Sequence, residues 1–96
     1  MLSKLMKTSK EFEKKSSLEV CVKTMEELGE VAQAILSSKD VCGCGYKGLT
    51  REDVLEEVAD VIICATSIAE KEGFTAEELE SKIFEKIEKW MRKLGA

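Results

Sequence analysis

Residues 54–69, VLEEVADVIICATSIA, are the stretch of the chain that decides its fold. Apolar side chains recur here on nearly every side of a helix, and no proline or glycine interrupts the run. A helix that is apolar all round lies at the centre of a core or in an interface between subunits. We therefore expect this segment to be the central helix, packed against other helices or a second copy of the chain.

Start and stop signals around this segment predict the other helices. Residues 16–19 (SSLE), 50–53 (TRED) and 75–78 (TAEE) each place a hydroxyl three residues before a carboxylate, which is the pattern of a helix start. Gly73 and Gly95 follow the last two of these helices, where glycine ends a helix. A short amphipathic segment with Leu2, Leu5 and Phe12 predicts a further helix before Ser16. The sequence thus predicts an all-α bundle of about four helices in one domain, 1–96.

The helix expected over 17–38 has a single apolar stripe. Its members are Leu18, Cys21, Met25, Leu28, Ala32 and Ile35, and this is the face that we expect to be buried. Cys21 and Cys64 fit apolar positions, so we interpret them as small buried side chains. The glycine-rich stretch 37–49, with Cys42 and Cys44, is expected to form a loop, and all four cysteines are expected to be reduced.

Composition excludes several classes of function. The 96 residues contain no histidine, which excludes Ser-His-Asp catalysis and His-ligated zinc. The 15 basic residues against 19 acidic ones give a net charge of −4 without a basic block, so we expect no binding to a nucleic acid polymer. No apolar run is long enough for a signal peptide or a membrane span, and we expect a cytoplasmic protein without a membrane partner.

Two pairs of carboxylates are the candidate functional residues. Glu57 and Asp60 lie one turn apart on the apolar helix, and we expect Asp60, between 58–59 (VA) and 61–63 (VII), to be the acid in apolar surroundings. Glu27 and Glu30 share the same spacing on the helix before it. If these helices pack antiparallel, the four acids converge, and two like charges about 4 Å apart repel by roughly 4 kcal/mol. A divalent cation would relieve this repulsion, and oxygen ligands alone favour Mg²⁺ or Mn²⁺. The alternative is a solvated acidic face on a non-catalytic helical dimerisation module.

These acids also carry a resemblance to a known family. Glu27-x-x-Glu30, a gap of 26 residues, and Glu57-x-x-Asp60 resemble the paired E-x-x-E and E-x-x-D motifs of the MazG-like, all-α nucleoside triphosphate pyrophosphohydrolases. Residues 23–35 (KTMEELGEVAQAI) and 56–68 (EEVADVIICATSI) are similar to the two core helices of this family, and 70–90 to its turn and final helix.

The resemblance implies Mg²⁺-dependent hydrolysis of a nucleoside triphosphate to the monophosphate and pyrophosphate. By this resemblance Glu27, Glu30, Glu57 and Asp60 would hold the metal, and Glu30 or Glu27 would act as general base. The family's last helix usually carries Lys, then Asn, then Arg or Lys, and the matching positions are Lys82, Lys86 and Lys89, so that Lys86 departs from the pattern. Lys82 and Lys86 would then bind substrate. Lys23, one turn before Glu27, would neutralise the acids or reach a phosphate.

The resemblance also implies a homodimer or homotetramer with active sites near subunit interfaces. A second enzyme of this kind, phosphoribosyl-ATP pyrophosphohydrolase, has comparable acid motifs. It typically shows an aromatic residue and a histidine after the last acid, where this chain has 61–64, VIIC. We therefore rank that activity below hydrolysis of a nucleoside or deoxynucleoside triphosphate.

Overall fold

The computed structural model describes residues 1–40 and 43–95, apart from the side chain of Cys44. Every regular element among these residues is helical. The elements are α1 (Leu2–Phe12), α2 (Ser17–Ser38), the 3₁₀ helix η1 (Cys44–Lys47), α3 (Arg51–Lys71) and α4 (Ala76–Lys93). The predicted all-α class and the four main helices are confirmed. The prediction of reduced thiols at Cys42 and Cys44 falls outside the described residues and side chains.

Each of the three predicted helix starts is a reciprocal pair of hydrogen bonds. The Ser16 hydroxyl accepts from the Glu19 amide at 3.2 Å, and the Glu19 carboxylate accepts from the Ser16 amide at 3.0 Å. The same arrangement joins Thr50 to Asp53 and Thr75 to Glu78. These bonds satisfy amides that have no partner within the first turn of a helix, which is why this spacing predicted the boundaries correctly.

Loss of the Ser16 hydroxyl should lower the stability of the protein. We expect Ser16→Ala to reduce the free energy of unfolding by about 1 kcal/mol, because the Glu19 amide then loses its acceptor. Ser16→Thr keeps the hydroxyl and should stay close to the wild type. Urea denaturation of the three proteins measures the difference, and equal losses in both variants would contradict the capping role.

Gly73 ends α3 in the way that the sequence predicted. Its φ of +86° lies in the left-handed region that favours glycine. Its amide donates to the Glu70 carbonyl at 3.0 Å, and the Phe74 amide donates to the Ala69 carbonyl at 3.0 Å. This pair of bonds satisfies the last carbonyls of α3 and turns the chain sharply into α4.

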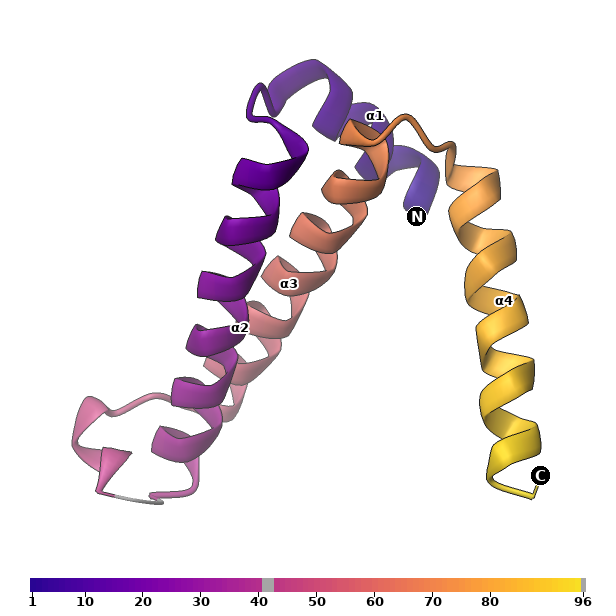
Figure 1. Cartoon of the computed structure of the whole chain (residues 1–96). Helices are drawn as coiled ribbons and strands as arrows, with labels where there is room; N and C mark the ends of the chain where they lie inside the picture. The colour runs from indigo at the N-terminus through magenta and orange to yellow at the C-terminus, as the bar shows by residue number, and fades with distance from the viewer. Residues whose placement is uncertain (41–42, 96) are drawn as a thin grey trace.

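The helices are arranged around an antiparallel pair. Helices α2 and α3 lie side by side as a long hairpin joined through η1, and α1 packs across one end of it against α3 (Figure 1). Helix α4 leads away from the hairpin and contacts mainly α1. As predicted, α3 is the central helix, because it contacts both α2 and α1. None of the helices in the described residues is both long enough and apolar enough to span a membrane.

The apolar stripe of α2 is exposed in the single chain, whereas the sequence predicted that it would be buried. Its members face outward in the single chain, and Leu18 and Met25 are 74% and 70% exposed. The prediction that Cys21 is buried is wrong for the single chain, because Cys21 lies on this outward face. The face of α2 turned toward α3 instead carries Val20, Glu27, Ala34 and Ser37, its buried residues. The stripe is therefore available to a partner rather than used in the core of one chain.

Helix α4 also leaves its apolar side uncovered. None of its described residues is buried, and Phe84 and Trp90 are 59% and 63% exposed. An amphipathic helix gains most of its stability from packing of its apolar face. A single chain does not provide that packing for α4.

Candidate metal centre

Three carboxylates meet where the middles of α2 and α3 lie against each other. Glu27 comes from α2, and Glu57 and Asp60 come from successive turns of α3. One carboxylate oxygen from each of the three lies within 4.8 Å of the other two. We call these residues the acid cluster. It combines carboxylates from two helices, as the antiparallel packing of the two motifs predicted.

The acid cluster contains carboxylate oxygens that are buried away from water and have no hydrogen-bond partner among the described residues. Glu27 is only 7% exposed, and Glu57 is half-buried. The Oε2 atoms of both residues are buried and have no hydrogen-bond partner among the described residues. Buried charged oxygens without a partner are costly, so they call for a cation or a proton. An oxygen-only set of this kind fits Mg²⁺ or Mn²⁺.

The structure buries a different acid from the one that the sequence predicted. Asp60 was expected to be the acid in apolar surroundings, but it is exposed. The reason is that α3 contacts α2 and α1 on only part of its circumference, so its neighbours Val58 and Ile62 are themselves exposed in the single chain. The buried acid is Glu27. It lies seven residues from both Val20 and Ala34, two turns in each direction, and this spacing was the signal for its position on the buried face.

Glu30 lies beside the acid cluster rather than within its closest group. It is exposed, and its carboxyl neighbours that of Glu57. The structure therefore gathers all four predicted acids in one region, with three in a tight group and the fourth at its solvent side.

The crowding of carboxylates changes the acidity of Glu57. The pKa of Glu57 is raised to about 7, mainly by withdrawal from water, next by the Glu30 carboxyl, and then by the charges of Asp60 and Glu27. Each of these causes disfavours the charged form of Glu57. The metal-free acid cluster thus holds a proton over part of the physiological pH range.

This shift predicts a pH dependence for the metal-free protein. Between the ordinary value of 4.5 and about 7, the folded state binds more protons at Glu57 than the unfolded state does. The contribution of Glu57 to stability should therefore fall as pH rises through this window and level off above it. Denaturation in chelator at several pH values measures the slope. Glu57→Gln should flatten it, and an unchanged slope in that variant would assign the effect to another group.

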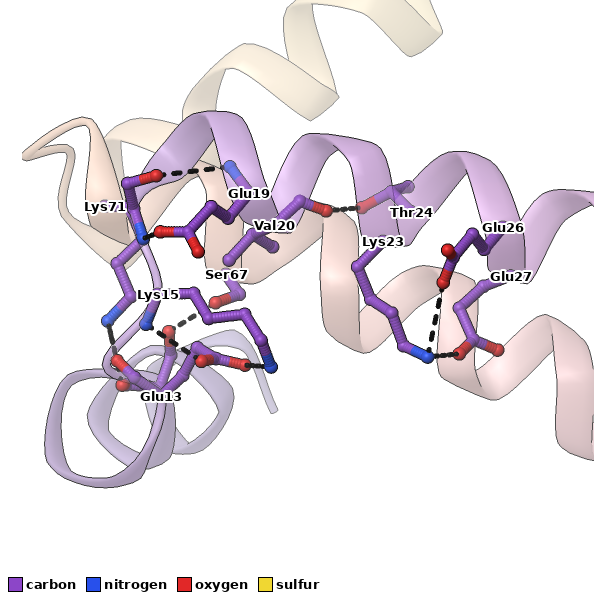
Figure 2. A network of polar contacts seen from close by, with 12 residues as sticks. Glu13, Lys15, Glu19, Val20, Lys23, Thr24, Glu26, Glu27, Ser67 and Lys71 are labelled. Atoms are coloured by element: carbon purple, nitrogen blue, oxygen red, sulfur yellow. Dashed lines mark hydrogen bonds and ion pairs between the residues drawn. The ribbon is translucent and has the colours of Figure 1, made fainter.

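Lys23 neutralises one side of the acid cluster. Its Nζ lies 3.1 Å from Oε1 of Glu27 and 3.7 Å from Oε2 of Glu26, and Figure 2 shows it reaching between the two. The hydrogen bond to Glu27 raises the pKa of Lys23. Lys23 therefore holds one oxygen of Glu27 and leaves the other, Oε2, without a partner.

Lys82 and Lys86 do not reach the acid cluster within one chain. Both lie on α4, which leads away from the hairpin (Figure 1), and Lys82 pairs with Glu85 of its own helix at 2.8 Å. Cys64, by contrast, lies close to the acids although the sequence suggested only a packing role. Burial raises the pKa of its thiol, and the negative charges of Glu27 and Asp60 act in the same direction. Its position one turn after Asp60 was the available signal.

Comparison with known proteins assigns the chain to a family. A family model described as the MazG nucleotide pyrophosphohydrolase domain matches residues 15–94. Comparisons with curated proteins and with solved structures gave no significant match. The family match spans α2, α3 and α4, and therefore includes every member of the acid cluster. The chain belongs to the MazG nucleotide pyrophosphohydrolase domain family.

Proposed function

We propose that this protein hydrolyses a nucleoside or deoxynucleoside triphosphate to the monophosphate and pyrophosphate, with Mg²⁺ as cofactor and Mn²⁺ as an alternative. The observation that carries the proposal is the pair of buried, unpartnered oxygens on Glu27 and Glu57. The family match supports the reaction class, and the oxygen-only donor set supports the choice of metal.

The burial and charge of each residue indicate its role in the proposed reaction. Glu27, Glu57 and Asp60 would hold the cation, with Glu30 supporting it from the solvent side. The cation would supply neutralisation of the phosphate charge and activation of water. Lys23 fixes the orientation of the Glu27 carboxylate. We assign Glu30 as the general base, because it is exposed to water whereas Glu27 is buried and already paired with Lys23.

A homo-oligomer belongs to the same proposal, as a dimer or a tetramer. The outward stripe of α2 and the uncovered apolar side of α4 are surfaces that a second copy would bury. Lys82 and Lys86 lie on α4, which leads away from the hairpin that carries the acid cluster (Figure 1). In the proposed assembly they would contact the substrate phosphates at the acid cluster of a partner chain.

Sedimentation at micromolar concentration tests the assembly. We expect a mass of at least twice the 10.7 kDa of one chain, because two amphipathic helices would otherwise leave large apolar side chains in water. Leu28→Glu places a charge in the outward stripe and should shift the protein toward monomer, whereas Glu26→Lys, on the polar side of α2, should not. A stable monomer in the wild type would contradict the shared-site proposal.

A substrate screen tests the reaction itself. Purified protein is incubated with the common ribonucleoside and deoxyribonucleoside triphosphates and with phosphoribosyl-ATP, each in Mg²⁺, and the products are separated. We expect monophosphate and pyrophosphate from at least one triphosphate. Turnover of phosphoribosyl-ATP alone would favour the second activity. Release of diphosphate and phosphate would contradict the proposed bond cleavage.

Metal binding separates the enzyme from a dimerisation module. Mg²⁺ at about 100 times its dissociation constant should stabilise the folded protein by about 2.7 kcal/mol, because it binds the folded state in preference to the unfolded one. Calorimetric titration that detects no divalent cation, with or without nucleotide, would favour the non-catalytic module.

A further inference from the structure

Lys23 is the counter-ion of the acid cluster in the metal-free protein. Its Nζ lies 3.1 Å from Oε1 of Glu27, whose side chain is only 10% exposed. Among the described residues, Lys23 is the only basic side chain in an ion pair with a member of the acid cluster. The hydrogen bond to Glu27 and the charges of Glu27, Glu26 and Glu30 raise the pKa of Lys23, so its ammonium stays charged in this position.

One ammonium does not balance the carboxylates that meet here. Glu27, Glu57 and Asp60 form the tight group, and Glu30 neighbours Glu57. With Lys23 in place, the Oε2 atoms of Glu27 and Glu57 still have no hydrogen-bond partner among the described residues. The site therefore remains an acceptor for a cation while Lys23 already holds one side of it.

A divalent cation at Oε2 of Glu27 would have the Lys23 ammonium as a close neighbour. Mg²⁺ lies about 2.0 to 2.1 Å from its carboxylate oxygens, and Oε1, which Lys23 holds, belongs to the same carboxylate. Like charges at such short separations repel, and the repulsion grows with the double charge of the ion. The ion pair of Lys23 is the weaker of the two interactions, because the Lys23 side chain is 46% exposed. Lys23 is thus the partner that a cation would displace.

The Lys23 side chain has somewhere to move without leaving the site. It lines a cavity of about 410 Å³ together with residues of α1 and α3. Its Nζ also lies 3.7 Å from Oε2 of the exposed Glu26, and Figure 2 shows the ammonium between the two carboxylates. An ammonium displaced from Glu27 would therefore stay beside the acid cluster, where it could meet a second anion.

We propose that Lys23 exchanges its partner when the site fills. A divalent cation at Oε2 of Glu27 displaces the ammonium from Oε1, and the released ammonium pairs with a phosphate of the bound nucleotide. The proposal rests on the proposed function, since the nucleotide would bring its phosphates to this cation. Lys23 then opposes binding of the metal alone and favours binding of the metal with phosphates. The exchange couples the two binding steps, so that each ligand strengthens the binding of the other.

Calorimetric titration of Mg²⁺ without nucleotide tests the first half of the exchange. Lys23→Met removes the charge and keeps an unbranched side chain. We expect Mg²⁺ to bind Lys23→Met at least about tenfold more tightly than the wild type, because no ammonium opposes the ion. The titration is done at a pH above the pKa of Glu57, about 7, so that a proton competes little with the ion. Unchanged or weaker Mg²⁺ binding in Lys23→Met would overturn the exchange.

Inorganic pyrophosphate in excess Mg²⁺ tests the second half. This probe carries phosphates without a base or sugar, and the proposed reaction releases it as a product. We expect it to bind Lys23→Met at least about tenfold more weakly than the wild type, because the ammonium that would pair with it is gone. The two effects have opposite signs, whereas a side chain that only supported the fold would weaken both ligands. Equal pyrophosphate affinity in both proteins would overturn the exchange.

Two further variants separate the charge at this position from net charge. Lys23→Arg keeps the positive charge, so its affinity for Mg²⁺ should stay within about threefold of the wild type. Lys15→Met removes a lysine whose Nζ pairs with Glu13 at 3.8 Å, outside the acid cluster, and should change neither affinity. Equal changes in Lys15→Met and Lys23→Met would assign the effects to net charge and overturn the exchange.

The wild type offers a readout that needs no loss of charge. The chemical shifts of the Lys23 ε-methylene group are followed in chelator, in Mg²⁺, and in Mg²⁺ with pyrophosphate, with Lys23→Arg to assign the signal. We expect one change when Mg²⁺ binds and a second when pyrophosphate binds, because the ammonium changes partner at each step. A signal that stays in place while calorimetry shows bound Mg²⁺ would overturn the exchange.

The outcomes separate the exchange from the proposed function. Hydrolysis of a triphosphate to monophosphate and pyrophosphate, with unchanged Mg²⁺ affinity in Lys23→Met, would overturn the exchange and leave the reaction standing. Opposite changes in Mg²⁺ and pyrophosphate affinity in Lys23→Met, without hydrolysis of any triphosphate by the wild type, would support the exchange and overturn the reaction.

Discussion

Asp60→Asn should lower kcat/KM at least about 100-fold, because it removes one of the three carboxylates that would hold the cation. Replacement of residues that only support metal ligands already costs about 10- to 100-fold, so loss of a ligand should cost more. The side chain keeps its shape, and Asp60 is exposed, so the fold should tolerate the change. In chelator the variant should be at least as stable as the wild type, since one of several repelling charges is gone.

Glu56→Gln is the matched control for this experiment. Glu56 is an exposed carboxylate on the same helix, outside the acid cluster. It should keep near-normal turnover and metal binding. If Asp60→Asn releases pyrophosphate at a near-normal rate in saturating Mg²⁺, the assignment of the acid cluster as the metal centre is wrong.

Glu27→Gln should cause a loss of similar size, for a different structural reason. Glu27 is the most buried of the acids and carries an unpartnered oxygen, so its charge is the one that most needs a cation. The neutral amide would both weaken the metal site and release Lys23 from its 3.1 Å ion pair. We expect Mg²⁺ binding measured by calorimetry and kcat/KM measured by pyrophosphate release to fall together.

The adjacent residue provides the control for Glu27. Glu26→Gln removes the other partner of Lys23, at 3.7 Å, from an exposed position outside the acid cluster. An exposed ion pair of this kind contributes little to stability. Glu26→Gln should therefore retain turnover. Equal losses in Glu26→Gln and Glu27→Gln would indicate a general effect of acidic charge on α2 rather than a defined metal centre.

The boundaries of the helices were predictable because they depend on neighbouring residues. Ser16 with Glu19 and Gly73 after α3 act through hydrogen bonds that close within one turn. The shared face of the two acids in each motif was likewise predictable, because a spacing of three residues places both on one side of a helix whatever surrounds it.

The burial of individual residues was predicted less well. The stripe of α2 with Leu18 and Met25 was expected to be the buried face, and in the single chain it is the exposed one. Periodicity identifies an apolar face but not what covers it, and in the proposed oligomer a second subunit would cover the face that this short chain leaves exposed. The same ambiguity led to the expectation that Asp60, rather than Glu27, lies in apolar surroundings.

The sequence by itself determined the all-α class, the helix boundaries and the two acid pairs, because these follow from local hydrogen bonding and helical periodicity. Only the tertiary structure decided that Glu27 is the buried acid, that Lys23 holds one of its oxygens, and that α1 and Lys23 line the same cavity. These features depend on the rotation of α2 about its axis against α3 and on the docking of α1 through Ser9 and Lys71. Both are contacts between segments far apart in the chain. The spacing of seven residues places Glu27 on the same face as Val20 and Ala34, but no local pattern shows that α3 covers this face.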